Sequence, residues 1–118
     1  MALDGTGALL ATVFRSPARL VLLDTAAGAV AASLATCGDP DDVFFDGRRR
    51  RLYVSCGEGV VDAVQQEAGG VLRLLARTKT SSGARTSLFV PELDRLFVAA
   101  RAGLLGSDAA LLMFRAEP

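Results

Sequence analysis

Short apolar runs bounded by glycine, proline, aspartate and serine recur along the whole chain. Leu52-Tyr53-Val54 is a typical run, and it is followed closely by the turn Gly57-Glu58-Gly59. Runs rich in β-branched and aromatic residues between such turns predict short strands. The runs are continuous rather than alternating, which is expected when both faces of a sheet are covered. A helix is the rival interpretation for the Ala- and Leu-rich residues 21–34, but Thr25 to Gly28 interrupts that stretch.

The pattern repeats with a period of about forty residues, which is the length of a four-stranded propeller blade. Phe44-Phe45 corresponds to Leu88-Phe89, and Leu52-Tyr53-Val54 corresponds to Leu96-Phe97-Val98. At the front of the chain, Leu3-Asp4-Gly5 matches Phe45-Asp46-Gly47. The repeat predicts an all-β fold, a partial β-propeller of nearly three four-stranded antiparallel blades with about eleven strands.

The expected blades divide residues 1–118 into three units of one partial propeller. Blade 1 covers about 1–37, blade 2 about 41–80 and blade 3 about 85–116, and blade 3 lacks its outer strand. We call the strands of a blade A to D, from the inside of the propeller to the outside. The expected strands are Met1–Asp4, Ala8–Phe14, Arg19–Asp24, Val30–Thr36, Asp42–Asp46, Arg51–Cys56, Val60–Gln65, Val71–Lys79, Thr86–Val90, Arg95–Ala99 and Ala110–Arg115.

Composition narrows the class of protein and excludes several kinds of site. Hydrophobic residues make up 51% of the chain and charged residues 22%, which is enough apolar content for a core. Basic and acidic residues balance at 13 each, so no global field attracts nucleic acid or an anionic membrane. The absence of histidine excludes Ser-His-Asp and Cys-His catalysis and histidine-ligated metals within this chain.

Three stretches resemble the YVTN-repeat β-propellers, particularly the YncE-like group of bacterial proteins. They are residues 21–34, Asp46-Gly47 followed by Leu52-Tyr53-Val54-Ser55, and residues 83–92. The resemblance implies the C-terminal part of a seven-bladed ring and a non-enzymatic binding or interaction scaffold without a cofactor. Two alternatives come with it: an accessory or substrate-binding portion of a quinoprotein-type oxidoreductase, or a weak single-stranded DNA binder. The compartment would be periplasmic or secreted if the full-length parent carries a signal peptide, and cytoplasmic otherwise.

Strand alternation brings the D–A and B–C loops to one face of the propeller, which we call the loop face. The charged residues expected there as ligand-binding candidates are Arg15, Asp41, Asp42, Glu58, Arg85 and Arg101. Asp39 joins Asp41, Asp42 and Glu58 as oxygen ligands in a calcium alternative. The simpler interpretation is a polar rim whose aspartates cap turns. No catalytic residue or metal site is assigned.

The two cysteines are expected on the loop face as well. Cys37 lies in the D–A loop that enters blade 2, and Cys56 ends the second strand of that blade. Buried free thiols are one interpretation, and a disulfide is the other if the two Cα atoms lie within about 7 Å.

On the opposite face, Arg48-Arg49-Arg50-Arg51 forms an A–B turn that we interpret as solvated. Glu92 and Asp94 lie in the corresponding turn of blade 3, and we expect no neighbour to shift the pKa of either carboxyl. We therefore predict neither an acid–base pair nor a nucleic-acid site at these turns.

The terminal blades are expected to expose apolar faces, and the last strand an open edge. The outward apolar residues expected are Leu9, Leu10, Leu111, Leu112 and Phe114. The predicted partners are therefore the remaining propeller blades or further copies of the chain, besides an unknown protein or small-molecule ligand, with no membrane insertion.

Overall fold

The computed structural model describes residues 1–103, 106 and 108–118 and contains eleven strands in three antiparallel sheets. Blade 1 is formed by β1 (Ala2–Leu3), β2 (Leu9–Arg15), β3 (Ala18–Asp24) and β4 (Val30–Ala35). Blade 2 is formed by β5 (Pro40–Asp46), β6 (Arg51–Cys56), β7 (Val60–Gln66) and β8 (Leu72–Lys79). Blade 3 is formed by β9 (Ser87–Val90), β10 (Arg95–Ala100) and β11 (Ala110–Arg115). Two 3-10 turns, η1 (Ala68–Gly70) and η2 (Pro91–Leu93), complete the secondary structure.

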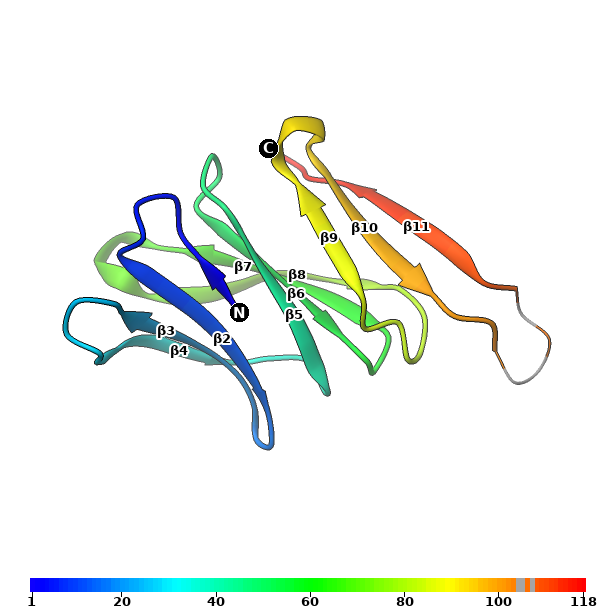
Figure 1. Cartoon of the computed structure of the whole chain (residues 1–118), viewed down its shortest axis with the longest axis horizontal. Helices are drawn as coiled ribbons and strands as arrows, with labels where there is room; N and C mark the ends of the chain where they lie inside the picture. Colours follow the sequence, from blue (N-terminus) through cyan, green and yellow to red (C-terminus); the bar gives the residue numbers. More distant parts are fainter. Residues whose placement is uncertain (104–105, 107) are drawn as a thin grey trace.

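The predicted fold class is confirmed: the chain is all-β, and its three sheets stand side by side like blades that do not close into a ring (Figure 1). Strands follow one another in sequence order within each sheet, so each blade is an antiparallel meander. The inner strands β1, β5 and β9 lie toward the middle of the fan, while β4, β8 and β11 are the outermost strands. The molecule measures 48 × 32 × 20 Å along its principal axes.

Blade 2 lies between two hydrophobic cores, one on each of its faces. Leu52 and Val54 point into the core shared with blade 1, where Leu20 and Leu22 are also buried. Tyr53, between them in sequence, points into the core shared with blade 3. The continuous apolar run in β6 therefore exists because alternate residues serve two different cores.

The outer faces of blades 1 and 3 are exposed, and the prediction of their residues is right for Leu111 and wrong for three others. Leu9, Leu112 and Phe114 pack against the cores instead of pointing outward. Besides Leu111, the exposed large apolar residues on the strands of these blades include Leu3, Phe14, Leu88 and Met113. The error arose because successive residues of a strand point to opposite faces of the blade. Both the covered and the exposed face carry apolar residues here, so the sequence does not show which residues face outward.

No helix in the described part of the chain is long and apolar enough to cross a membrane.

Candidate functional site

The loop face is organised by backbone hydrogen bonds between loops of successive strands. The amide of Gly57 donates to the carbonyl of Asp39 at 2.8 Å, and the amide of Gly83 donates to the carbonyl of Gly57 at 2.7 Å. The β4–β5 loop, the β6–β7 turn and the β8–β9 loop therefore form one connected surface, at the lower ends of the sheets in Figure 1.

Four charged side chains on this surface form a network of ion pairs. Asp39 accepts from the Arg85 Nε at 2.7 Å and lies 3.2 Å from the Arg15 Nε. Arg15 also pairs with Asp41. Gly57 has no room for a side chain because the Asp39–Arg85 pair passes over its Cα. The two arginines and two aspartates neutralise one another, so this network carries little net charge toward a ligand.

The other loop-face candidates have separate roles. The Glu58 carboxylate accepts from the amide of Gly38 at 2.6 Å, and the Asp42 carboxylate accepts from the amide of Ser87 at 3.4 Å. The guanidinium of Arg101 lies over Gly83. Asp42 therefore connects blade 2 to blade 3, while Glu58 holds the loop that enters blade 2.

The calcium alternative finds no support in this geometry. Asp39 and Asp41 are paired with arginines, and Asp42 and Glu58 accept from backbone amides. Within the described residues, no three acidic, cysteine or histidine side chains are grouped so that they could hold a metal ion.

The two cysteines form a disulfide, with Cα atoms 6.0 Å apart. Both residues are buried. The amide of Cys37 donates to the carboxylate of Asp62 at 2.8 Å, and Asp62 in turn accepts two bonds from Arg77 at 2.6 and 2.9 Å. Asp62 is fully buried, and its hydrogen bonds raise the pKa of the Arg77 guanidinium. The disulfide and this ion pair together fasten the crossing from blade 1 to blade 2.

On the opposite face, the arginine turn contains a buried charge cluster that the sequence interpretation missed. Asp46 is only 3% exposed, and its carboxylate accepts from the Tyr53 hydroxyl at 2.8 Å and from the Arg49 Nη1 at 3.0 Å. The same Arg49 atom donates to Asp94 of blade 3 at 3.0 Å. A buried carboxylate needs a counterion, which is why Arg49 turns inward and is not solvated.

This cluster shifts the pKa of its members, contrary to the expectation for Asp94. Hydrogen bonding to Arg49 lowers the pKa of the Asp94 carboxyl, and Asp94 and Asp46 raise the pKa of Arg49. Burial, followed by the hydrogen bond to Asp46, raises the pKa of Tyr53 to about 12. The signal available in the sequence was the Asp-Gly pair before the first two A–B turns, Asp4-Gly5 and Asp46-Gly47, which the third turn lacks.

Arg51 also leaves the solvated turn and holds the last residues of the chain. Its Nε donates to the Gln65 side chain at 3.1 Å, and its Nη2 donates to the carbonyl of Pro118 at 2.9 Å. A further bond goes to the carbonyl of Glu117. Only Arg48 and Arg50 are exposed as the solvated interpretation expected, and Arg48 also pairs with Asp94 at 3.2 Å.

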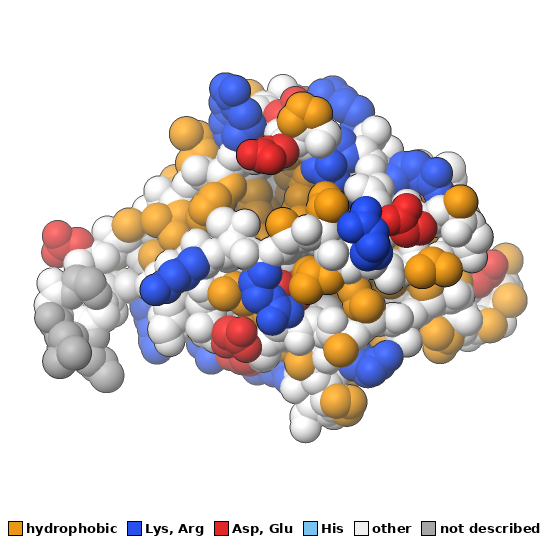
Figure 2. Space-filling model, turned by 180° about the vertical axis from the view of Figure 1, so that it is seen from behind, with side chains coloured by type: hydrophobic (Ala, Val, Ile, Leu, Met, Phe, Trp, Pro, Cys, Tyr) orange, Lys and Arg blue, Asp and Glu red, His pale blue; other side chains and the backbone are white. Residues whose placement is uncertain are grey.

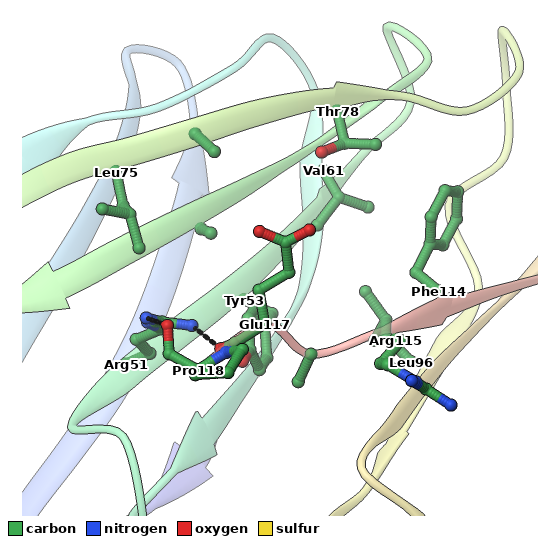
Figure 3. Close-up of a pocket in the computed structure, with 13 residues that line it drawn as sticks. Arg51, Tyr53, Val61, Leu75, Thr78, Leu96, Phe114, Arg115, Glu117 and Pro118 are labelled. Carbon is green, nitrogen blue, oxygen red and sulfur yellow. Dashed lines mark hydrogen bonds between the residues drawn. The ribbon is translucent and has the colours of Figure 1, made fainter.

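A groove of about 550 Å³ lies between blade 2 and the outer part of blade 3. Figure 2 shows a hollow floored by hydrophobic side chains and bordered by basic ones on the rear face. Its lining residues are Arg51, Tyr53, Val61, Ala63, Leu75, Ala76, Thr78, Leu96, Phe114, Arg115, Ala116, Glu117 and Pro118. Figure 3 places Val61, Leu75 and Thr78 on the blade 2 side and Phe114 across from them. Sequence reasoning predicted that blade 3 lacks an outer strand, but it missed this groove, because the lining comes from five strands that only tertiary packing brings together.

Tyr53 forms the inner wall of the groove, where its ring meets Phe89 edge-on with centroids 5.0 Å apart. The other border is the outer edge of β11, which pairs only with β10 among the described strands. The groove thus combines an apolar floor with free backbone donors and acceptors.

Comparison with known proteins supports the fold. No family model and no curated protein matches the sequence. A solved structure, that of a Bacteroides fragilis protein assigned as a 6-phosphogluconolactonase, is similar with a TM-score of 0.73 at 14% identity. The match covers 98% of this chain and 38% of that protein, so the chain spans well under half of its structural neighbour. At this identity the likeness establishes a propeller-like fold and no activity, and the YncE-like resemblance stays a prediction.

Proposed function

We propose that the chain is a non-enzymatic β-propeller scaffold that binds an extended polypeptide in the groove between blades 2 and 3. The observation that carries the proposal is the apolar groove beside the outer edge of β11, along which no other described strand pairs. A strand added along β11 gains backbone hydrogen bonds, and its alternate side chains enter the groove.

The corresponding position in blade 2 supports this mode of binding. There, β8 pairs along β7 over its whole length, from Val60–Lys79 to Gln66–Leu72. Blade 3 offers β11 at the equivalent edge, with Phe114 facing the groove. The ligand chemistry that fits is an extended peptide with apolar residues at alternate positions. An acidic residue at one end would suit the exposed Arg115, which makes no ion pair within the described residues.

The enzymatic and DNA-binding alternatives have no comparable support. The chain contains no histidine. The structural neighbour is only 14% identical in sequence, so the similarity supports a shared fold and no shared activity. Two arginines of the basic turn, Arg49 and Arg51, are already engaged with protein groups.

Tyrosine fluorescence tests the proposal directly, because Tyr53 is the only tyrosine, the chain has no tryptophan, and Tyr53 lines the groove. The probe is an octapeptide of alternating Val and Thr that ends in Glu and contains no aromatic residue. We expect the fluorescence emission of Tyr53 to change saturably as this peptide is added. Ala76→Arg, on the groove floor, should weaken binding by about tenfold or more, because it places an unpaired charge in an apolar site.

Two controls define what would overturn the proposal. Ala68→Arg places the same charge on the exposed η1 turn, away from the groove, and should leave binding unchanged. An all-proline octapeptide has no backbone amide N–H to donate to the strand edge and should not bind. Equal binding by the wild type and Ala76→Arg, or no emission change with the Val/Thr peptide, rules out groove binding.

A further inference from the structure

Each blade has two faces. Because the sequence repeats, equivalent residues of different blades lie on the same kind of face. We call the face toward the preceding blade the upstream face and the other the downstream face. Cross-strand pairing defines one three-residue row at the centre of each. The upstream rows are Phe45–Leu52–Val64 in blade 2 and Phe89–Leu96–Phe114 in blade 3, and both pack against the preceding blade.

The downstream rows follow the same rule. They are Ala2–Ala11–Leu22 in blade 1 and Phe44–Tyr53–Ala63 in blade 2. Both pack against the blade that follows. The molecule therefore makes one type of interface twice, each time an upstream row against a downstream row.

One row of each type is packed against no other blade in the described part of the chain. The upstream row of blade 1 is Leu3–Leu10–Leu23, and the downstream row of blade 3 is Leu88–Phe97–Met113. Leu3 and Met113 are 60% and 62% exposed, whereas the equivalent residues Phe45 and Ala63 are partly buried against the cores. The uncovered rows are apolar, as their equivalents are, so the chain carries both halves of the interface that it already forms internally.

We infer that a second copy of this chain covers these rows, with the downstream face of blade 3 in one copy packed on the upstream face of blade 1 in the next. Such a contact is head-to-tail, and it continues the established interblade interface with the same pair of faces. Two copies would place six blades around a twofold axis with two identical interfaces, within the four to eight blades of closed propellers.

Complementation between two surface variants tests this contact. The first variant, Leu88→Glu with Met113→Glu, damages only the downstream face of blade 3. The second, Leu3→Glu with Val30→Glu, damages only the upstream face of blade 1, where Val30 extends the row beside Leu23. All four side chains are exposed, so the substitutions leave the cores intact, and circular dichroism checks the fold of each variant.

The expected result, measured by size-exclusion chromatography with light scattering, is that each variant alone is a monomer. An equimolar mixture should give the mass of two chains, because it retains one intact pair of faces. A monomeric mixture overturns the inference and leaves the faces to blades of a different chain. Self-association of either variant alone also overturns it, since the chains would then associate without pairing these two faces.

Val71→Glu is the matched control, because Val71 is 59% exposed and lies in the turn before β8, outside both rows. It should associate as the wild type does.

Discussion

At the scale of single residues, Asp94 connects two blades through charge. It lies in the turn after η2, where its φ of 51° is left-handed, and it accepts from Arg48 and Arg49 of blade 2. Asp94→Asn tests the charge alone, since asparagine tolerates the same backbone conformation. We expect a lower urea midpoint for Asp94→Asn than for the wild type at neutral pH.

The pH dependence follows from the lowered pKa of the Asp94 carboxyl. A carboxyl with a lower pKa in the folded chain stabilises that state above its ordinary pKa of about 4, and this stabilisation is lost as pH falls through the folded value. The difference between Asp94→Asn and wild type should therefore vanish in acid. Glu92→Gln, in the same turn and without an ion pair among the described residues, should match the wild type at every pH. If Asp94→Asn lowered the urea midpoint equally at every pH, the stabilisation by Asp94 would come from packing and not from its charge.

At the scale of elements, the disulfide fixes the passage from β4 into blade 2. It closes a loop with a sequence separation of 19 and lies buried beside Asp62. A crosslink of this span stabilises a fold by roughly 3 kcal/mol, chiefly by restricting the unfolded chain. Replacement of both cysteines by alanine should lower the free energy of unfolding by about that amount.

Reductant provides the second half of this test. Because both sulfur-bearing residues are buried, the folded wild type should keep its disulfide in reductant and lose it only after denaturant opens blade 2. Unfolding curves of the wild type in denaturant with reductant should then approach those of the alanine double variant. An unchanged midpoint in both cases would mean that Asp62 and Arg77 hold the crossing without the disulfide.

The prediction of elements from sequence succeeded where one strand serves two cores. Leu52-Tyr53-Val54 could be predicted as a strand because all three residues are buried, which makes the run continuously apolar. The charge clusters were not predictable in the same way, since Arg49 finds Asp94 only after blades 2 and 3 pack. The loop-face candidates Arg15, Asp41 and Arg85 do lie near one another, but pairwise neutralisation could not be seen from residue type alone. The groove depends on how the strands around β11 pack, and no local sequence pattern predicts that packing.

At the scale of the whole molecule, stability should be graded from blade 2 outward. Blade 2 has a core on each face, whereas blades 1 and 3 have one each. In such arrays each unit is stabilised by itself and by its neighbours. Native-state hydrogen exchange should therefore show the greatest protection in β6 and the least in β11.

Val54 and Val98 provide a matched pair for this gradient, because they occupy equivalent repeat positions and are both fully buried. Val→Ala removes two methyl groups at either site and costs about 2 kcal/mol of local packing. Val54→Ala weakens the central blade, on which both neighbours pack, so it should accelerate exchange in all three blades. Val98→Ala should accelerate exchange in β9 to β11 and leave β2 and β3 unchanged, because it weakens a terminal blade and blade 1 packs on blade 2 instead. Uniform acceleration by both variants would instead mean that the three blades unfold as a single cooperative unit.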